Sequence, residues 1–133
     1  MSAEVFFDTS VLVYAFTNDP GRTPIAQQLL SDGGVISVQV LNEYVAVLRR
    51  KQGKEWNEVE QGLAYIRELC PKCLPITLKM HESAVLIAAR YKFQIYDGLI
   101  LAAALMADCS TLYSEDMQHG QQIQGLTIRN PFL

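Results

Sequence analysis

The sequence predicts an α/β fold, in which helices cover both faces of a parallel sheet. Short apolar runs that end in turn residues alternate with stretches of helical periodicity along the whole chain, which is typical of parallel strands joined by helices. The chain has 133 residues, half of them hydrophobic, and no repeat, low-complexity run or linker interrupts this pattern. We therefore expect residues 1–133 to form one domain with a sizeable core.

The first strand is predicted over residues 5–7, where three apolar residues precede an acid. A short buried helix over residues 11–16 should follow, started by Ser10. After a turn, Thr23 and the proline that follows it predict the start of a helix. This helix, over residues 24–31, should end at a pair of glycines.

A second short strand is predicted over residues 35–37, after which Ser37 can cap a helix that runs to Gly53. That helix is apolar nearly all round, so we expect it to be buried. Asn57, with a glutamate three positions later, resembles a capping box. It predicts an amphipathic helix that ends near Leu69 and pairs antiparallel with the previous one.

Residues 74–77 predict a third strand, whose proline suits an edge or a strand start. A helix over residues 78–91 should follow, with Val85 among its inward-facing residues. Asp97 stands at the mouth of a long apolar helix and is its natural cap. Residues 111–114 then predict another buried strand, and further acids follow it at once.

Four acidic residues should meet at one edge of the predicted sheet. Asp8 and Asp116 each follow a buried strand, and the carboxyl ends of parallel strands share one rim. Glu43 and Asp97 lie on helices whose N-terminal parts open at that rim. Acids in such positions can also have a purely structural role, because Asp8 and Asp97 can cap helices and Glu43 can reach water. Four converging carboxylates would need a cation, and ligation by oxygen alone selects Mg²⁺ or Mn²⁺.

A basic cluster follows the helix that carries Glu43, and it comprises Arg49, Arg50, Lys51 and Lys54. Cations at a helix C-terminus complement the macrodipole, which is a sufficient structural explanation. Arg50 also lies about 10 Å from Glu43 along the helix axis, which suits a phosphate next to a metal-bound one. The cluster is therefore a candidate RNA-binding surface.

The net charge of −3 and the pI of about 5.3 argue mildly against nucleic-acid binding. Carboxylates gathered in a metal pocket, however, are neutralised by the ion that they hold. The ten acidic residues outside the predicted pocket balance the eleven basic residues. The acidic pI therefore does not exclude an RNA substrate.

Membrane insertion, export and disulfide bonding find no support in the sequence. The longest uncharged apolar run, residues 98–107, is about half of the ~20 residues that a membrane helix needs. The N-terminus lacks a basic stretch followed by an apolar signal core, so we expect a cytoplasmic protein. Cys70, Cys73 and Cys109 form neither an even disulfide set nor a four-ligand zinc set, and we expect reduced thiols without an assigned role.

Four motifs, in this order and at these spacings, resemble those of the PIN domain, most closely those of single-domain toxin ribonucleases of the VapC kind. The motifs are Asp8-Thr9-Ser10 after a hydrophobic strand, Glu43 within Leu41-Asn42-Glu43-Tyr44, Asp97 within Tyr96-Asp97-Gly98-Leu99-Ile100, and Ser114-Glu115-Asp116-Met117-Gln118-His119-Gly120. Each motif is weak by itself, whereas the ordered set of four is specific. The resemblance covers essentially the whole chain.

The resemblance implies a three-layer α/β/α sandwich with a mainly parallel central sheet. It also implies an endoribonuclease that hydrolyses RNA phosphodiester bonds with water activated by one or two Mg²⁺ or Mn²⁺ ions. The implied catalytic metal ligands are Asp8, Glu43, Asp97 and Asp116, with supporting roles for Ser114, Thr9 and Ser10. The implied partners are a small antitoxin that blocks the site and, frequently, a second copy of the chain.

Apolar residues near the chain ends also predict association. Tyr14 and Phe16, together with the C-terminal Phe132-Leu133, exceed what a small monomer readily hides. We therefore expect a homodimer with a further groove for an antitoxin.

Other enzyme classes fit the residues less well. A phospho-accepting receiver domain needs a late lysine, and none follows Lys92. A phosphatase of the Asp-x-Asp kind would need an aspartate at the position of Ser10, and a P-loop is absent. The remaining alternative is a PIN-like module that binds nucleic acid or protein without catalysis.

Overall fold

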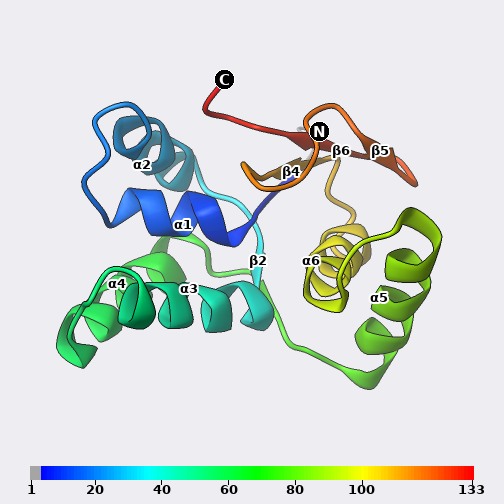
Figure 1. Ribbon diagram of the computed structural model, residues 1–133, viewed down its shortest axis with the longest axis horizontal. Helices are drawn as coiled ribbons and strands as arrows, with labels where there is room; N and C mark the ends of the chain where they lie inside the picture. The colour runs from blue at the N-terminus through cyan, green and yellow to red at the C-terminus, as the bar shows by residue number, and fades with distance from the viewer. Residues whose placement is uncertain (1–3) are drawn as a thin grey trace.

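The computed structural model describes residues 4–133 and contains a four-stranded sheet and a two-stranded sheet (Figure 1). The four-stranded sheet has the order β1-β4-β6-β5, with β1 (Val5–Phe7), β4 (Thr111–Tyr113), β6 (Leu126–Arg129) and β5 (Gln122–Ile123). Strands β1, β4 and β6 are parallel, and β5 is antiparallel to β6. The smaller sheet pairs β2 (Ile36–Ser37) with β3 (Cys73–Leu74) in parallel.

A parallel bridge between Phe6 and Val35 joins the two sheets. The Phe7 amide donates to the Val35 carbonyl at 3.0 Å, and the Val35 amide donates to the Val5 carbonyl at 2.8 Å. The strands therefore follow one another as β3-β2-β1-β4-β6-β5. The chain runs from β1 through β2 to β3 on one side and then crosses to β4 on the other. The junction of β1 and β4 is consequently the topological switch point, where open α/β sheets bind ligands.

Six helices accompany these strands in the described part of the chain. They are α1 (Thr9–Ala15), α2 (Thr23–Asp32), α3 (Val38–Arg50), α4 (Trp56–Leu69), α5 (Leu78–Tyr91) and α6 (Ile95–Met106). Figure 1 shows α1 to α4 gathered at the left and α5 beside α6 at the right, with β2 between the two groups. The predicted α/β fold with a mainly parallel central sheet is confirmed, and its layers agree with an α/β/α sandwich.

The starts of four helices differ from the sequence-based expectation. Helix α2 begins at Thr23, one residue before the expected start. Helix α1 begins at Thr9 rather than after Ser10, because Asp8 is its N-cap and accepts the Thr9 amide. Helix α4 is capped by Glu55 instead of Asn57. Helix α6 begins two residues before Asp97, which lies in its first turn and is not its cap. The expectation that Asp97 is a capping residue is therefore wrong, and its carboxylate is available for another role.

The third predicted strand is shorter than expected, because β3 ends at Leu74 and Thr77 instead caps α5 by accepting the Met80 amide. Strands β5 and β6 were not expected at all. They form a hairpin whose two-residue loop, Gln124 and Gly125, has positive φ at both positions, the backbone of a type I′ turn. Strands this short carry too little alternation to be recognised in the sequence.

Helix α6 is the most deeply buried helix of the described chain and packs directly on α5. All residues from Gly98 to Ala104 are buried. A Cβ atom at Gly98 would lie 2.7 Å from the backbone oxygen of Ala84, so only glycine permits this close approach of α6 to α5. This contact sets the position of Asp97, the preceding residue. None of the helices in residues 4–133 combines the length and the apolar character needed to cross a bilayer.

Candidate active site

Asp8 occupies the end of β1 at the switch point and is only 3 % exposed. Its Oδ1 atom accepts the backbone amide of Thr9 at 2.6 Å, and its Oδ2 atom accepts the hydroxyl of Ser114 at 2.6 Å. These two hydrogen bonds fix the orientation of the carboxyl group, while each oxygen keeps a further lone pair free. Asp8 is therefore both the cap of α1 and a preorganised oxygen donor.

The environment of Asp8 opposes its negative charge. Burial raises the pKa of Asp8 to about 7, because the charged form loses its hydration. The hydrogen bonds from Ser114 and Thr9 lower the pKa, while the charges of Glu43 and Asp116 raise it further. An added cation would reverse this balance.

Glu43 reaches the same place from the middle of α3. Its Oε1 atom accepts the hydroxyl of Thr9 at 3.1 Å, and its Oε2 atom accepts the side-chain amide of Gln39 at 2.9 Å. Thr9 thus links Glu43 to the backbone that follows Asp8. The alternative that Glu43 merely reaches water does not account for these two contacts.

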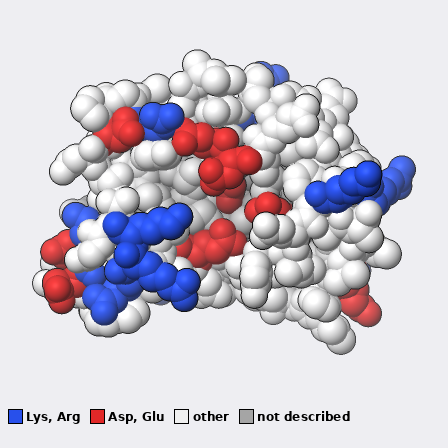
Figure 2. Space-filling view, viewed as in Figure 1, with Lys and Arg blue, Asp and Glu red and all other residues white. Residues whose placement is uncertain are grey.

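Asp97 and Asp116 complete the acidic group from two further elements. Asp97 is partly buried, and burial raises its pKa, with further contributions from the charges of Glu43 and Asp116. Asp116 is exposed on the turn after β4. The charges of Glu43 and Asp116 thus act on both Asp8 and Asp97, which indicates that the four carboxylates lie near one another. Figure 2 shows acidic side chains gathered around a hollow in the middle of this face.

Ser114 organises the turn that carries Asp116. Its buried Oγ atom accepts the backbone amides of Asp116 at 3.2 Å and Met117 at 3.3 Å, so its own hydrogen is directed to Asp8. Ser10 supports the same turn, because its Oγ atom accepts the amide of Glu115 at 3.2 Å. Hydrogen bonds thus join Asp8 to Ser114 and Thr9 to Glu43, and Glu43 and Asp97 line the same cleft.

Comparison with known protein families identifies the domain. The family model of the PIN domain matches residues 5–121. The chain belongs to the PIN domain family. Strands β5 and β6 lie beyond the matched residues and complete the sheet of this PIN domain.

Solved structures of toxin–antitoxin proteins share the fold at low sequence identity. A toxin–antitoxin complex from Klebsiella pneumoniae aligns with a TM-score of 0.73 and 19% identity, over 96% of this chain and 97% of that one. VapC20 of Mycobacterium tuberculosis, described as a sarcin–ricin loop cleaving toxin, aligns with a TM-score of 0.70 and 21% identity, over 84% and 89%. VapBC2 of Rickettsia felis, bound to a DNA fragment from its promoter, aligns with a TM-score of 0.70 and 18% identity, over 95% and 97%. The search of curated proteins gives no match.

The residues of the site suit a hard divalent cation. The predicted ligands are carboxylates from four different elements, an all-oxygen set that favours Mg²⁺ or Mn²⁺. Within residues 4–133, no three histidine, cysteine or acidic side chains lie close enough together to enclose a metal ion as they stand. Ion binding would therefore require the carboxylates to close by side-chain movement, with waters completing the coordination.

A clamp beside the site was not anticipated from the sequence. Tyr14 donates its hydroxyl to Glu115 at 2.9 Å, and Arg22 forms a short ion pair with the other oxygen of Glu115. The Arg22 guanidinium also lies 5.3 Å from the centre of the Tyr14 ring. Glu115 stands between Ser114 and Asp116, so this clamp holds the turn that presents both residues. Its members lie about 100 residues apart in the chain, and no sequence pattern reveals such a contact.

The four predicted RNA-binding residues lie together at the C-terminal end of α3, beside the acidic hollow (Figure 2). Two of them are engaged locally: the Arg49 guanidinium lies 4.6 Å from the Trp56 ring centre, and Lys54 pairs with Glu58 at 3.7 Å. Arg50 and Lys51 are exposed and form no ion pair within the described residues. Arg50 lines a cleft that leads to Glu43 and Asp97.

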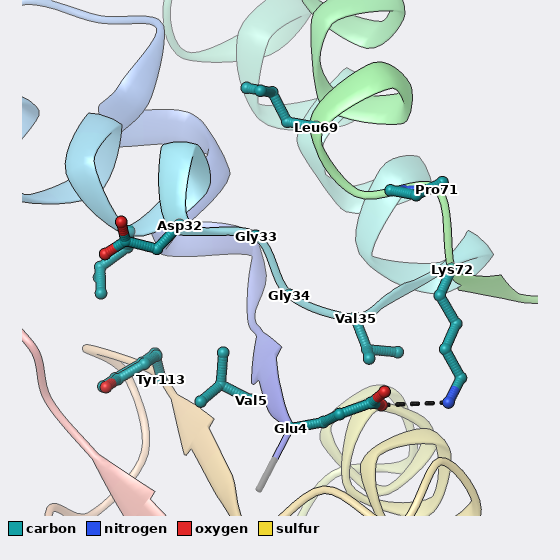
Figure 3. Close-up of a pocket in the computed structure, with 11 residues that line it drawn as sticks. Glu4, Val5, Asp32, Gly33, Gly34, Val35, Leu69, Pro71, Lys72 and Tyr113 are labelled. Carbon is teal, nitrogen blue, oxygen red and sulfur yellow. Dashed lines mark hydrogen bonds and ion pairs between the residues drawn. The ribbon is translucent and has the colours of Figure 1, made fainter. Parts of the chain in front are cut away.

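Another cavity, of about 540 Å³, lies away from the four predicted ligands, at the N-terminal end of β1 (Figure 3). It has two acidic residues, Glu4 and Asp32, and Glu4 pairs with Lys72 at 3.1 Å. The cleft beside Glu43 and Asp97 is nearly as large, about 520 Å³. Volume therefore does not distinguish the two cavities, whereas the convergence of carboxylates does.

The cysteines take no part in the site. Cys70 and Cys109 are buried free thiols, and burial raises the pKa of each to about 11. Cys73 is a partly buried free thiol. The expectation of free thiols agrees with the structure.

Replacement of Ser114 by Ala is expected to weaken both the fold and the site. The change leaves the buried amide of Met117 and the Asp8 carboxylate without their shared partner, at a cost of about 1–3 kcal/mol. Loss of a group that orients a metal ligand reduces activity by about 10- to 100-fold. Chemical denaturation and metal-dependent cleavage assays measure the two effects. The control is Ser110→Ala, because Ser110 makes no side-chain hydrogen bond within the described residues; equal effects of both changes would contradict the role of Ser114.

Proposed function

We propose that this PIN domain is a magnesium- or manganese-dependent endoribonuclease and the toxin of a toxin–antitoxin pair. The observation that carries the proposal is the convergence of Asp8, Glu43, Asp97 and Asp116 at the switch point of the sheet, with Asp8 buried and held by Ser114. Four acids in one place destabilise a fold unless a cation compensates them. Retention of that arrangement supports a metal-dependent function.

Asp8 and Glu43 would hold the ion, and Asp97 and Asp116 would complete the ligand set. The bound ion would supply an activated water for in-line attack on a phosphodiester and a charge that stabilises the leaving oxygen. Ser114 and Thr9 keep Asp8 and Glu43 in their ligating orientation, since each donates a hydrogen bond to one carboxylate. No side chain of the site needs to act as a nucleophile.

An RNA substrate is supported by the charge around the site and by the relatives. Arg50 and Lys51 extend a positive surface from the acidic hollow along α3, which suits a phosphate backbone that enters the site from that side. VapC20, which shares the fold, is described as cleaving the sarcin–ricin loop. We expect the protein to act in the cytoplasm.

An antitoxin partner is supported by the two related structures that contain toxin and antitoxin together. We expect the antitoxin gene product to suppress cleavage when the two proteins are mixed.

A homodimer is supported by exposed apolar residues on α5, whereas of the residues first considered only Leu133 is exposed. Tyr14 and Phe132 pack edge to face, with ring centroids 5.2 Å apart. Leu133 is 84 % exposed at the C-terminal end, and a group of exposed apolar residues lies on α5, where Leu78 is 74 %, Leu86 72 % and Val85 46 % exposed. Val85 was expected to face inward, and this expectation is wrong. Exposed apolar side chains of this size favour association with a second copy.

The decisive experiment is cleavage of single-stranded RNA by the purified full chain with Mg²⁺ or Mn²⁺, compared with EDTA. We expect cleavage only with a divalent ion, and we expect Glu43→Gln and Asp97→Asn to abolish it. The matched control is Asp108→Asn. Asp108 is exposed and has a φ of 56°, a conformation that asparagine tolerates. RNA binding without cleavage under all metal conditions would instead support a non-catalytic binding module.

A further inference from the structure

The cleft that leads away from Glu43 and Asp97 has the walls of a nucleotide subsite. One wall is a stripe of α3, because Gln39, Asn42, Glu43, Ala46 and Arg50 line the cleft and such spacings share one helix face. The other wall is the start of α6, with Gln94, Tyr96 and Asp97. The volume of about 520 Å³ falls in the range of about 300–1,000 Å³ that is usual for ligand pockets.

Tyr96 presents an exposed aromatic ring next to Asp97. The residue is 59 % exposed, and its ring forms no aromatic pair or cation contact within the described residues. Packing therefore does not explain a large aromatic side chain at this position. Exposed aromatic rings beside a phosphate-binding surface are typical platforms for unpaired bases.

Polar groups in the cleft are also free to bind a ligand. Gln39 is occupied by Glu43, whereas Asn42 and Gln94 are exposed and form no side-chain hydrogen bond within residues 4–133. Their amides can both donate to and accept from base edges. Arg50 stands at the far end of the cleft without an ion pair in the described chain.

We propose that this cleft binds a nucleotide of single-stranded RNA that adjoins the scissile phosphate, with its base stacked on Tyr96 and its outer phosphate bound by Arg50. The inference rests on the proposed function, because it takes the metal site at Glu43 and Asp97 as the position of the scissile phosphate. A base can stack on Tyr96 only when it is unpaired, so the subsite selects single strands over duplexes.

The test measures binding of a short, labelled, single-stranded RNA of mixed sequence to the full chain in EDTA, where no metal-dependent cleavage occurs. Tyr96→Ala is expected to weaken binding by about tenfold, the usual loss for one base stack, and Tyr96→Phe is expected to retain it. The matched control is Tyr65→Ala, since Tyr65 is 60 % exposed on α4. Arg50→Ala is expected to reduce the slope of log affinity against log salt concentration by about 0.7, the value for one phosphate contact. The control Arg90→Ala, at an exposed position, is expected to leave this slope unchanged.

A second arm replaces single nucleotides of the RNA by abasic ones. An abasic nucleotide at one particular position of the strand should weaken binding to wild type. The same abasic nucleotide should not weaken binding to Tyr96→Ala any further. Unchanged binding by Tyr96→Ala, or equal binding of a duplex, would overturn the proposal. If Tyr96 supports binding but no divalent ion produces cleavage, the subsite stands and the proposed ribonuclease fails. If Tyr96→Ala binds and cleaves as wild type, the ribonuclease stands and the subsite fails.

Discussion

Asp8→Asn is expected to abolish metal-dependent RNA cleavage while the chain stays folded. Asparagine keeps the shape of the side chain and its capping ability but removes the charge that would bind the ion. Even partners of metal ligands contribute about 10- to 100-fold, so we expect the loss of a direct ligand to exceed about 100-fold. Cleavage of a labelled RNA at saturating Mg²⁺ or Mn²⁺ measures the effect. If the protein arrests growth on expression, the variant should no longer do so.

The control for this change is Asp108→Asn, which alters the same functional group at an exposed position. Circular dichroism and a cooperative denaturation curve establish that each variant is folded. Full cleavage by folded Asp8→Asn would show that Asp8 is only the cap of α1. Equal losses in both variants would point to a general charge effect.

The same substitution is expected to stabilise the metal-free protein, and more so at high pH. The pKa of Asp8 is about 7 in the folded chain, against an ordinary value of 3.8 for an aspartate. The folded state therefore binds the proton more tightly, and stability falls as pH rises from about 4 to about 7. Above pH 7 the ionised Asp8 costs up to about 4 kcal/mol. The amide accepts only one of the two hydrogen bonds that the carboxylate accepts, so the net gain is smaller.

The measurement is the unfolding free energy of wild type and Asp8→Asn in EDTA between pH 5 and pH 8. The difference between the two proteins should grow with pH in favour of the variant, whatever the constant cost of the lost hydrogen bond. Addition of Mg²⁺ or Mn²⁺ at pH 8 should stabilise wild type, because a ligand of the folded state acts by mass action, and should act much less on the variant. Parallel pH profiles would contradict the assignment of a strained, buried charge to Asp8.

The candidate site was accessible from the sequence because its acids mark the ends of recognisable elements. Asp8 follows an apolar strand and Asp116 follows another, so the parallel-sheet rule brings them to one rim. Glu43 stood out as an acid within an apolar helix. The contacts of Glu115 with Tyr14 and Arg22 could not be recognised in the sequence, because they join distant segments of the chain.

The sequence by itself determined the α/β class and predicted one domain and the acidic group of Asp8, Glu43, Asp97 and Asp116, because apolar periodicity and strand-end acids are local signals. Only the tertiary structure decided that Asp97 is no cap, that β5 and β6 close the sheet, and that α5 carries exposed apolar residues. These features depend on how α6 approaches α5 at Gly98 and on which face remains uncovered. Such outcomes are settled by packing between segments far apart in the chain, which local propensity does not encode.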